Sequence, residues 1–172
     1  SGSYMLFERH GAAPSREVFK NIRFETPNCS ARLDNLRAVI LRSQLPMLDY
    51  NIQRWNERYR IIEDGLRNAS GVRIVERLQH EAFVGSSIQF HVDGFGNDEV
   101  PIFIDACQSR GVEVKWFGSE DPVAFTSRYD SWRYLQSIPE LPKTLATLST
   151  TCDIRVPLTF SEKDCREIAQ II

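Results

Sequence analysis

The spacing of the apolar residues changes once along this chain, and that change sets what the chain can fold into. From Arg32 to Asn68 the apolar residues recur every three or four positions, which is the period of an amphipathic helix. From Ser87 to Val92 polar and apolar residues alternate, which is the period of a half-buried strand. A turn-forming stretch, 68–71, separates the two patterns. The sequence therefore predicts a helical arm followed by a domain that contains a sheet.

The arm is expected over residues 31–70. Its first helix should begin near Arg32, with Ser30 as the N-cap and Asp34 in the first turn. Pro46 lacks an N–H group and clashes with the preceding turn, so it should break or bend the helix. The helical spacing resumes at Met47, which predicts two helices in series or one bent helix.

Residues 71–172 combine short strand patterns with helical ones. Strands are expected at 72–75, 87–92, 112–117 and 152–157, helices at 100–110 and 161–172, and helical turns near 132–135 and 145–148. Gly111 suits a left-handed cap after one helix, and Ser161 with Asp164 has the spacing of a capping box. The predicted fold class is α/β (α+β), a small layered domain packed against the arm. Residues 1–30 are rich in turn formers and are expected to be a connecting segment without a core of its own.

Composition argues against several classes of protein. The net charge of −2 and the pI of about 5.9 do not fit a nucleic-acid-binding domain. The four cysteines are far apart and lack a histidine at ligand spacing, so we expect reduced thiols and no metal site. The sequence has neither an apolar run long enough to span a membrane nor a signal pattern, so we expect a cytoplasmic protein with no membrane partner.

The sequence contains no catalytic motif that can be read directly. A phosphate-binding loop, a G-x-S-x-G elbow and an H-E-x-x-H pair are all absent, so no catalytic residue is expected in this chain. Aromatic and hydroxyl side chains gather instead in one predicted loop after the 112–117 strand, and such mixtures are common at ligand-binding sites. The substrate-binding candidates are Trp116, Phe117, Ser119 and Tyr129, although the same residues also fit a core-and-loop interpretation.

Three segments resemble the DegT/DnrJ/StrS aminotransferases. The stretch from Asn28 to Leu41, followed by Gln44-Leu45, is similar to the family's N-x-R-M…Q-L segment. The stretch 110–113 is similar to the family's A-R-G-I-e strand entry, and 154–164 is similar to its l-P-l-h…t-e-e-d ending. The pair His10-Gly11 corresponds to the R-n-H-G that follows the family's lysine-bearing segment. The three matches occur in the family's order and span nearly the whole chain.

The resemblance implies a fold type I enzyme with pyridoxal 5'-phosphate (PLP) as cofactor. The family has a large domain that holds PLP on a lysine and a smaller domain, with a mainly antiparallel sheet, that closes the site. Lys20, Lys115, Lys143 and Lys163 all lie outside any S-x-x-K motif, so this chain is expected to lack the Schiff-base lysine, to follow a missing large domain and to be inactive alone.

The resemblance also implies cofactor contacts from residues at the start of the arm. Arg32 is expected to reach the cofactor phosphate of the partner subunit in a homodimer, together with two nearby polar residues. These are Ser30, two positions before it, and Asn28, at the head of the motif. The chain departs from the family at this point, because Ser30 stands where Asn is common and Leu33 where Met is common.

The leading hypothesis is the C-terminal part of an aminotransferase that moves an amino group from glutamate or glutamine to a keto-sugar nucleotide or related compound. Two hypotheses from other classes remain open. One is a non-enzymatic α/β module that binds a small ligand or a partner and dimerises through its arm. The other is a helical nucleic-acid binder that uses the region from Arg16 to Arg42.

Overall fold

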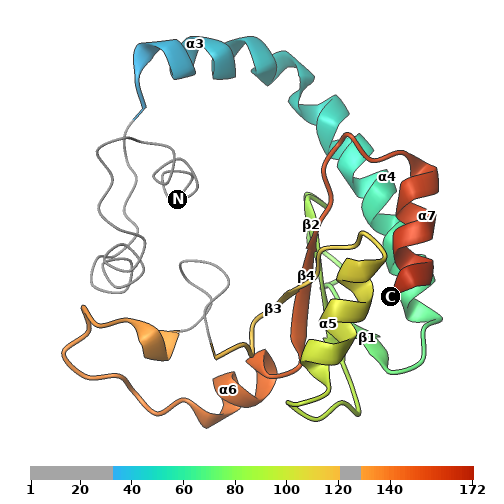
Figure 1. Cartoon of the computed structure of the whole chain (residues 1–172). Helices are drawn as coiled ribbons and strands as arrows, with labels where there is room; N and C mark the ends of the chain where they lie inside the picture. Colours follow the sequence, from blue (N-terminus) through green and yellow to red (C-terminus); the bar gives the residue numbers. More distant parts are fainter. Residues whose placement is uncertain (1–32, 121–128) are drawn as a thin grey trace.

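The fold consists of a helical arm and a small domain built on one antiparallel sheet (Figure 1). The computed structural model describes residues 33–120 and 129–172. The arm contains α3 (Asn35–Gln44), the 3-10 turn η1 (Leu45–Met47) and α4 (Leu48–Arg67). The domain contains strands β1 (Val72–Ile74), β2 (Ser87–Val92), β3 (Lys115–Trp116) and β4 (Thr151–Arg155), helices α5 (Val100–Ser109), α6 (Pro142–Leu148) and α7 (Glu162–Ile171), and the 3-10 turn η2 (Tyr129–Ser131). The expected mixed α/β class with an antiparallel sheet is confirmed.

A proline divides the arm, as the sequence predicted. Pro46 lies in η1, so α3 and α4 are two helices in series. The start of α3 differs from the expectation, because Asp34 is the N-cap and its Oδ1 accepts the backbone N–H of Arg37 at 2.8 Å. The helix therefore begins at Asn35, and Ser30 lies outside the described residues.

Four strands form the sheet in the order β1-β2-β4-β3, and every neighbouring pair is antiparallel. The register places Ile88 opposite Ile154 and Phe90 opposite Cys152. Because side chains alternate along a strand, these four residues share one face, and all four are buried in the core. The polar residues of the same strands, including His91 and Asp153, occupy the other face.

Three helices, α4, α5 and α7, cover the apolar face of the sheet. Leu66 of α4, Cys107 of α5 and Cys165 of α7 are all buried in the core that contains Phe90. Figure 1 shows α4 and α7 side by side, and the two helices contact each other extensively. Burying a side chain the size of Leu66 or Phe90 contributes about 1.5–3 kcal/mol, so this layer holds the domain together.

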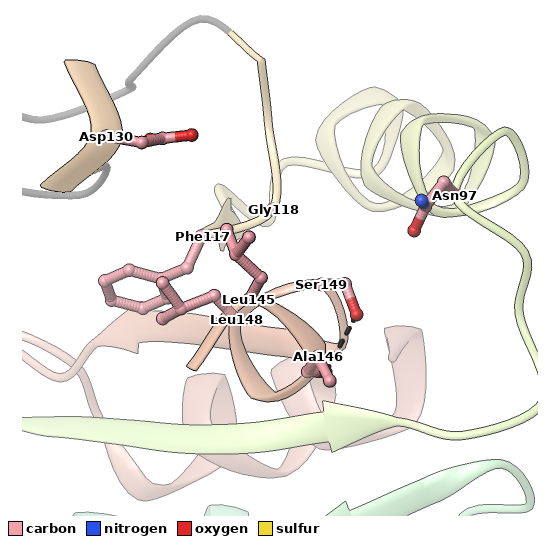
Figure 2. Close-up of a pocket in the computed structure, with 8 residues that line it drawn as sticks. All are labelled: Asn97, Phe117, Gly118, Asp130, Leu145, Ala146, Leu148 and Ser149. Atoms are coloured by element: carbon pink, nitrogen blue, oxygen red, sulfur yellow. Dashed lines mark hydrogen bonds between the residues drawn. The ribbon is translucent and has the colours of Figure 1, made fainter. Parts of the chain in front are cut away.

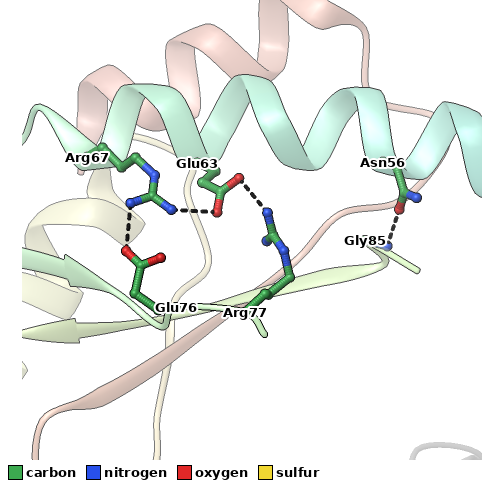
Figure 3. Close-up of polar contacts among 6 residues, drawn as sticks. All are labelled: Asn56, Glu63, Arg67, Glu76, Arg77 and Gly85. Carbon is green, nitrogen blue, oxygen red and sulfur yellow. Dashed lines mark hydrogen bonds and ion pairs between the residues drawn. The ribbon is translucent and has the colours of Figure 1, made fainter. Parts of the chain in front are cut away.

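Asn56 of α4 holds the long connection between β1 and β2 (Figure 3). Its Nδ2 donates to the carbonyl of Phe83 at 3.0 Å, and its Oδ1 accepts the N–H of Gly85 at 2.8 Å. One amide side chain thus satisfies a donor and an acceptor of a backbone that has no strand partner there.

A buried carboxylate ties the same connection to α4 two turns further on (Figure 3). Glu63 is 5% exposed, and it accepts hydrogen bonds from Arg77 at 2.9 Å and from Arg67 at 3.2 Å. The guanidinium of Arg77 lies 4.1 Å from the ring centroid of Phe83. Two cations and an aromatic face together offset the cost of removing this carboxylate from water.

Three of the expected strands are shorter in the structure, the first by one residue because β1 ends at Ile74. Gly111 has φ +88 and ends α5, as predicted, but the N–H of Val112 bonds to the carbonyl of Cys107 at 3.0 Å. Val112 thus belongs to the cap of α5, and β3 pairs only through Lys115 and Trp116. The expected 152–157 strand ends at Arg155.

The arm exposes apolar side chains along α3. Leu36 is 72% exposed and Val39 is 65% exposed, and α3 has no buried residue. Among the described helices, none is both long and apolar enough to cross a membrane.

Candidate functional site

A cavity of about 320 Å³ lies where β3 ends against α6 (Figure 2). Phe117 and Gly118 line it from the end of β3, and Leu145, Leu148 and Ser149 line it from α6 and its C-terminal end. Asn97, from the turn before α5, and Asp130, from η2, approach from two other sides. The cavity therefore joins four segments that are far apart in the sequence.

The end of β3 is fixed by packing between Trp116 and Gly118. The indole Nε1 of Trp116 donates to the carbonyl of Ser149 at 2.8 Å, which ties β3 to the end of α6. A Cβ atom at position 118 would lie 2.6 Å from three atoms of that indole, so only glycine fits there. Trp116 packs against the core, while Phe117, the next residue, lines the cavity.

Lys115 and Phe117 lie on the same face of the sheet, and the lysine covers the aromatic ring. The Nζ of Lys115 is 4.1 Å from the ring centroid of Phe117, which is a cation–π distance. Partial burial lowers the pKa of Lys115, and the carboxylate of Asp153 opposes this effect. The ring of Phe117 is thus held in place by a neighbouring charge.

The cavity combines an apolar wall with a few polar groups. Phe117, Leu145 and Leu148 supply the apolar surface, and Asp130 and Asn97 supply a carboxylate and an amide. Such a combination suits an organic ligand that carries both a ring and hydrogen-bonding groups.

The structure brings together only part of the predicted substrate-binding set. Phe117 lines the cavity, whereas the indole of Trp116 is bonded to the backbone of Ser149. Ser119 and Tyr129 are half-buried, and each lies one residue from a lining residue. Ser30 and Arg32, like Asn28, lie outside the described residues, so the cofactor-binding set stays a prediction.

Phe117 is the one lining residue in the predicted set, and Asn97, Asp130 and Leu145 are among the lining residues that were not predicted. The signals for them were weak, because Asn97 was assigned to a turn and Leu145 to a helical turn. The neighbourhood of Asp130 was indicated only by Tyr129, the residue before it. Within residues 33–120 and 129–172 there is no group of three or more His, Cys, Asp or Glu side chains that could hold a metal ion.

The family model of the DegT/DnrJ/EryC1/StrS aminotransferase family matches residues 3–172. The chain belongs to this family. The predicted resemblance is thereby confirmed over almost the full length of the chain. None of the curated proteins matches the sequence.

Solved aminotransferase structures share the fold of this family member. Helicobacter pylori PseC, an aminotransferase involved in the biosynthesis of pseudoaminic acid, matches with a TM-score of 0.67 at 13% identity, over 99% of this chain and 44% of that one. The aminotransferase TlmJ from Streptoalloteichus hindustanus matches with a TM-score of 0.63 at 17% identity, over 85% of this chain and 38% of that one. 3-Amino-5-hydroxybenzoic acid synthase matches with a TM-score of 0.60 at 17% identity, over 92% of this chain and 47% of that one.

The chain of this family member is much shorter than the solved chains that it matches. It covers 32% of the sugar aminotransferase CalS13 from Micromonospora echinospora, 31% of DesI and 44% of PseC. It therefore spans about a third to a half of the length of these proteins.

Proposed function

We propose that this chain is the C-terminal part of a PLP-dependent aminotransferase that moves an amino group from glutamate or glutamine to a keto-sugar nucleotide or a related keto compound. The observation that carries the proposal is the family match over residues 3–172. The antiparallel sheet covered by α4, α5 and α7 supports it, because the solved aminotransferases named above have the same fold.

The lysines of the described part do not fit the role of the Schiff-base lysine. The Nζ of Lys115 lies over the ring of Phe117, and the Nζ of Lys163 pairs with Glu167 at 3.4 Å. Lys143 is exposed on α6. The cofactor, which supplies the electron sink for amino transfer when bound, would be held on a lysine of a large domain outside this chain.

The proposed division of labour follows the predicted boundaries. Residues 1–30 connect to the large domain, residues 31–70 form the arm between domains, and residues 71–172 form the small domain. The exposed apolar residues of α3 support this division, since a surface of Leu36, Val39 and Ile40 calls for a covering partner. We assign that cover to the large domain and to the second subunit of a homodimer.

Two roles are assigned to individual residues. Arg32, with Ser30 and Asn28, would hold the cofactor phosphate, for which a guanidinium near a helix N-terminus is well suited. Phe117 would contact the keto acceptor through the cavity at the end of β3, where Asp130 and Asn97 offer hydrogen-bonding groups.

The first test is amino transfer itself. We expect a polypeptide that carries this chain together with a PLP-binding domain to transfer the amino group of glutamate to keto-sugar nucleotides. The 172-residue chain alone should neither transfer the amino group nor bind PLP covalently. Borohydride trapping of PLP on one lysine of the isolated chain would overturn the proposal.

The second test addresses the acceptor role of Phe117. In the active polypeptide, Phe117→Ala should raise the KM for the keto acceptor about tenfold, the scale expected for a lost apolar contact, with little change in the KM for glutamate. The matched control is Ile102→Ala, because Ile102 is 69% exposed on α5 and does not line the cavity. An unchanged acceptor KM would reject this role of Phe117 and leave the family assignment intact.

A further inference from the structure

A second cavity, of about 610 Å³, lies where the chain segments of β3 and β4 separate. Pairing between these strands ends at Lys115 opposite Asp153, and the pairs that would follow in this register, Val114 with Ile154 and Glu113 with Arg155, are not formed. The cavity is lined by Glu113, Lys115, Asp153 and Arg155, together with Pro157. We call it the β3–β4 fork; it lies on the other side of Lys115 from the cavity at Phe117.

Charges of both signs surround the mouth of the fork. Glu113 and Arg155 are exposed, and Lys115 is half-buried. Within the described part of the chain these three side chains form no ion pair with a protein group. Lys115 nevertheless lies close enough to Asp153 and Arg155 for both to act on its pKa, which Asp153 raises and Arg155 lowers. Asp153 is 8% exposed, and it accepts a hydrogen bond from Nε2 of Gln89 at 2.5 Å.

The interior of the fork is apolar. Val112 and Ile154 are buried core residues. Phe160, just before α7, and Ile168, within α7, are half-buried and pack against the core. All four line the cavity. The lining of the fork therefore combines apolar side chains with two cations and two carboxylates.

The edge of β4 adds backbone groups at the same place. On β4, the backbone N–H and C=O groups of Thr151 and Asp153 point toward β3. The 3.0 Å bond from the N–H of Phe117 to the carbonyl of Thr151 shows this alternation. The alternation continues to Arg155, where β3 has already left the ladder. A ligand in the fork can thus reach a strand edge as well as the charged side chains.

We propose that the β3–β4 fork binds a free amino acid with an apolar side chain. Lys115 and Arg155 face the carboxylate, Glu113 and Asp153 face the ammonium group, and the side chain enters the pocket beside Ile154 and Phe160. A simple anion meets two carboxylates at this mouth and a simple cation meets two basic groups, so a zwitterion matches the site better than either. Glutamate is disfavoured, because its second carboxylate would lie against the apolar interior.

The experiment is calorimetric titration of the 172-residue chain with L-leucine. L-Leucine is expected to bind, while 4-methylpentanoate, which lacks the ammonium group, and 3-methylbutylamine, which lacks the carboxylate, should bind at least tenfold more weakly. L-Glutamate should also be at least tenfold weaker. Equal binding of leucine and 4-methylpentanoate, or no binding of leucine at millimolar concentration, would overturn the proposal.

Substitutions locate the site. Arg155→Gln should weaken leucine binding at least tenfold, whereas Arg166→Gln, an exposed α7 residue that does not line the fork, should leave it unchanged. The urea midpoints of both variants check that the fold is intact. If both variants bind leucine as the parent does, leucine does not bind in the fork. Amino-transfer activity is not part of the readout, so the result is independent of the proposed function.

Discussion

Gly65 of α4 and Ala169 of α7 lie in direct contact, and the contact requires glycine at position 65. A Cβ atom built on Gly65 would lie only 2.5 Å from the Cβ of Ala169. Ala169 is 8% exposed, so the alanine is enclosed by the helices around it. The two small residues let α4 and α7 approach closely, and this approach closes the helical layer over the sheet.

Gly65→Ala should therefore destabilise the domain. A methyl group at this position forces the helices apart, and overpacking of this kind costs about 1–3 kcal/mol. The higher helix propensity of alanine, about 0.5–1 kcal/mol, offsets only part of the loss. Urea unfolding followed by circular dichroism measures the change in the free energy of unfolding.

Two further variants separate the steric effect from other effects of adding a methyl group. In the Gly65→Ala background, Ala169→Gly removes the clashing atom, so the double variant should lose less stability than the sum of the single variants. Gly96→Ala is the control, because its nearest neighbour would be Oε2 of Glu99 at an ordinary 3.5 Å. A Gly65→Ala variant as stable as the parent would show that the helices adjust freely.

Asn56→Ala should release the β1–β2 connection from α4. The substitution leaves the carbonyl of Phe83 and the N–H of Gly85 without their partner, which costs about 1–3 kcal/mol. Hydrogen exchange should localise the effect, with faster exchange of the Gly85 amide. Gln53→Ala on the exposed side of α4 is the matched control and should change stability by less than about 0.5 kcal/mol. Unchanged exchange at Gly85 would contradict the assigned role of Asn56.

The sequence predicted the elements with a strong local pattern. The alternation at 87–92 became β2, Pro46 divided the arm, and Ser161 with Asp164 formed the capping box of α7. Strand ends that depend on partners were wrong, since β3 pairs only through Lys115 and Trp116, while Val112 belongs to the cap of α5.

The candidate site could be predicted only in part, for a related reason. Phe117, which was predicted because a strand pattern and a loop meet there, lines the cavity. Asn97 and Asp130 come from segments about 30 residues apart that only the folded chain brings together. Local spacing carries no information about such contacts, so residues of this kind cannot be predicted from the sequence alone.

His91 should make the domain less stable as the pH falls below neutral. Nδ1 of His91 lies 3.0 Å from Oγ1 of Thr150 and 3.3 Å from Oγ1 of Thr151, and both hydroxyls also lie within hydrogen-bond distance of the carbonyl of Thr147. The side chain of His91 is 8% exposed. Protonation of His91 would therefore place a charge in a buried site.

The direction of this pH dependence follows from the pKa of His91. Burial lowers the pKa in the folded state, Arg73 lowers it further, and Asp93 opposes both. Because the folded pKa lies below that of the unfolded chain, about 6.5, stability is full above pH 6.5 and is lost as the pH falls through the folded pKa. Urea unfolding between pH 7.5 and 5 should show this loss, and His91→Gln should flatten it. His80→Gln, in an exposed loop, should leave the pH dependence as it is. A parent protein whose stability is constant over this range would refute the prediction.

The buried thiols should resist modification until the domain opens. Burial raises the pKa of Cys152 to about 12 and also raises the pKa values of Cys107 and Cys165. At pH 8 the thiolate fraction of a thiol with a pKa near 12 is on the order of 10⁻⁴, and the thiolate is the reactive form. In a Cys29→Ser background, which removes the cysteine outside the described residues, an aromatic disulfide reagent should label the folded protein slowly and the urea-unfolded protein quickly.

Adding Gly65→Ala should speed the labelling of Cys165, because that residue lies on α7, the helix displaced by the new methyl group. Rapid labelling of the folded parent would show that the helical layer opens without the strain assigned to position 65, and would remove the basis for both predictions.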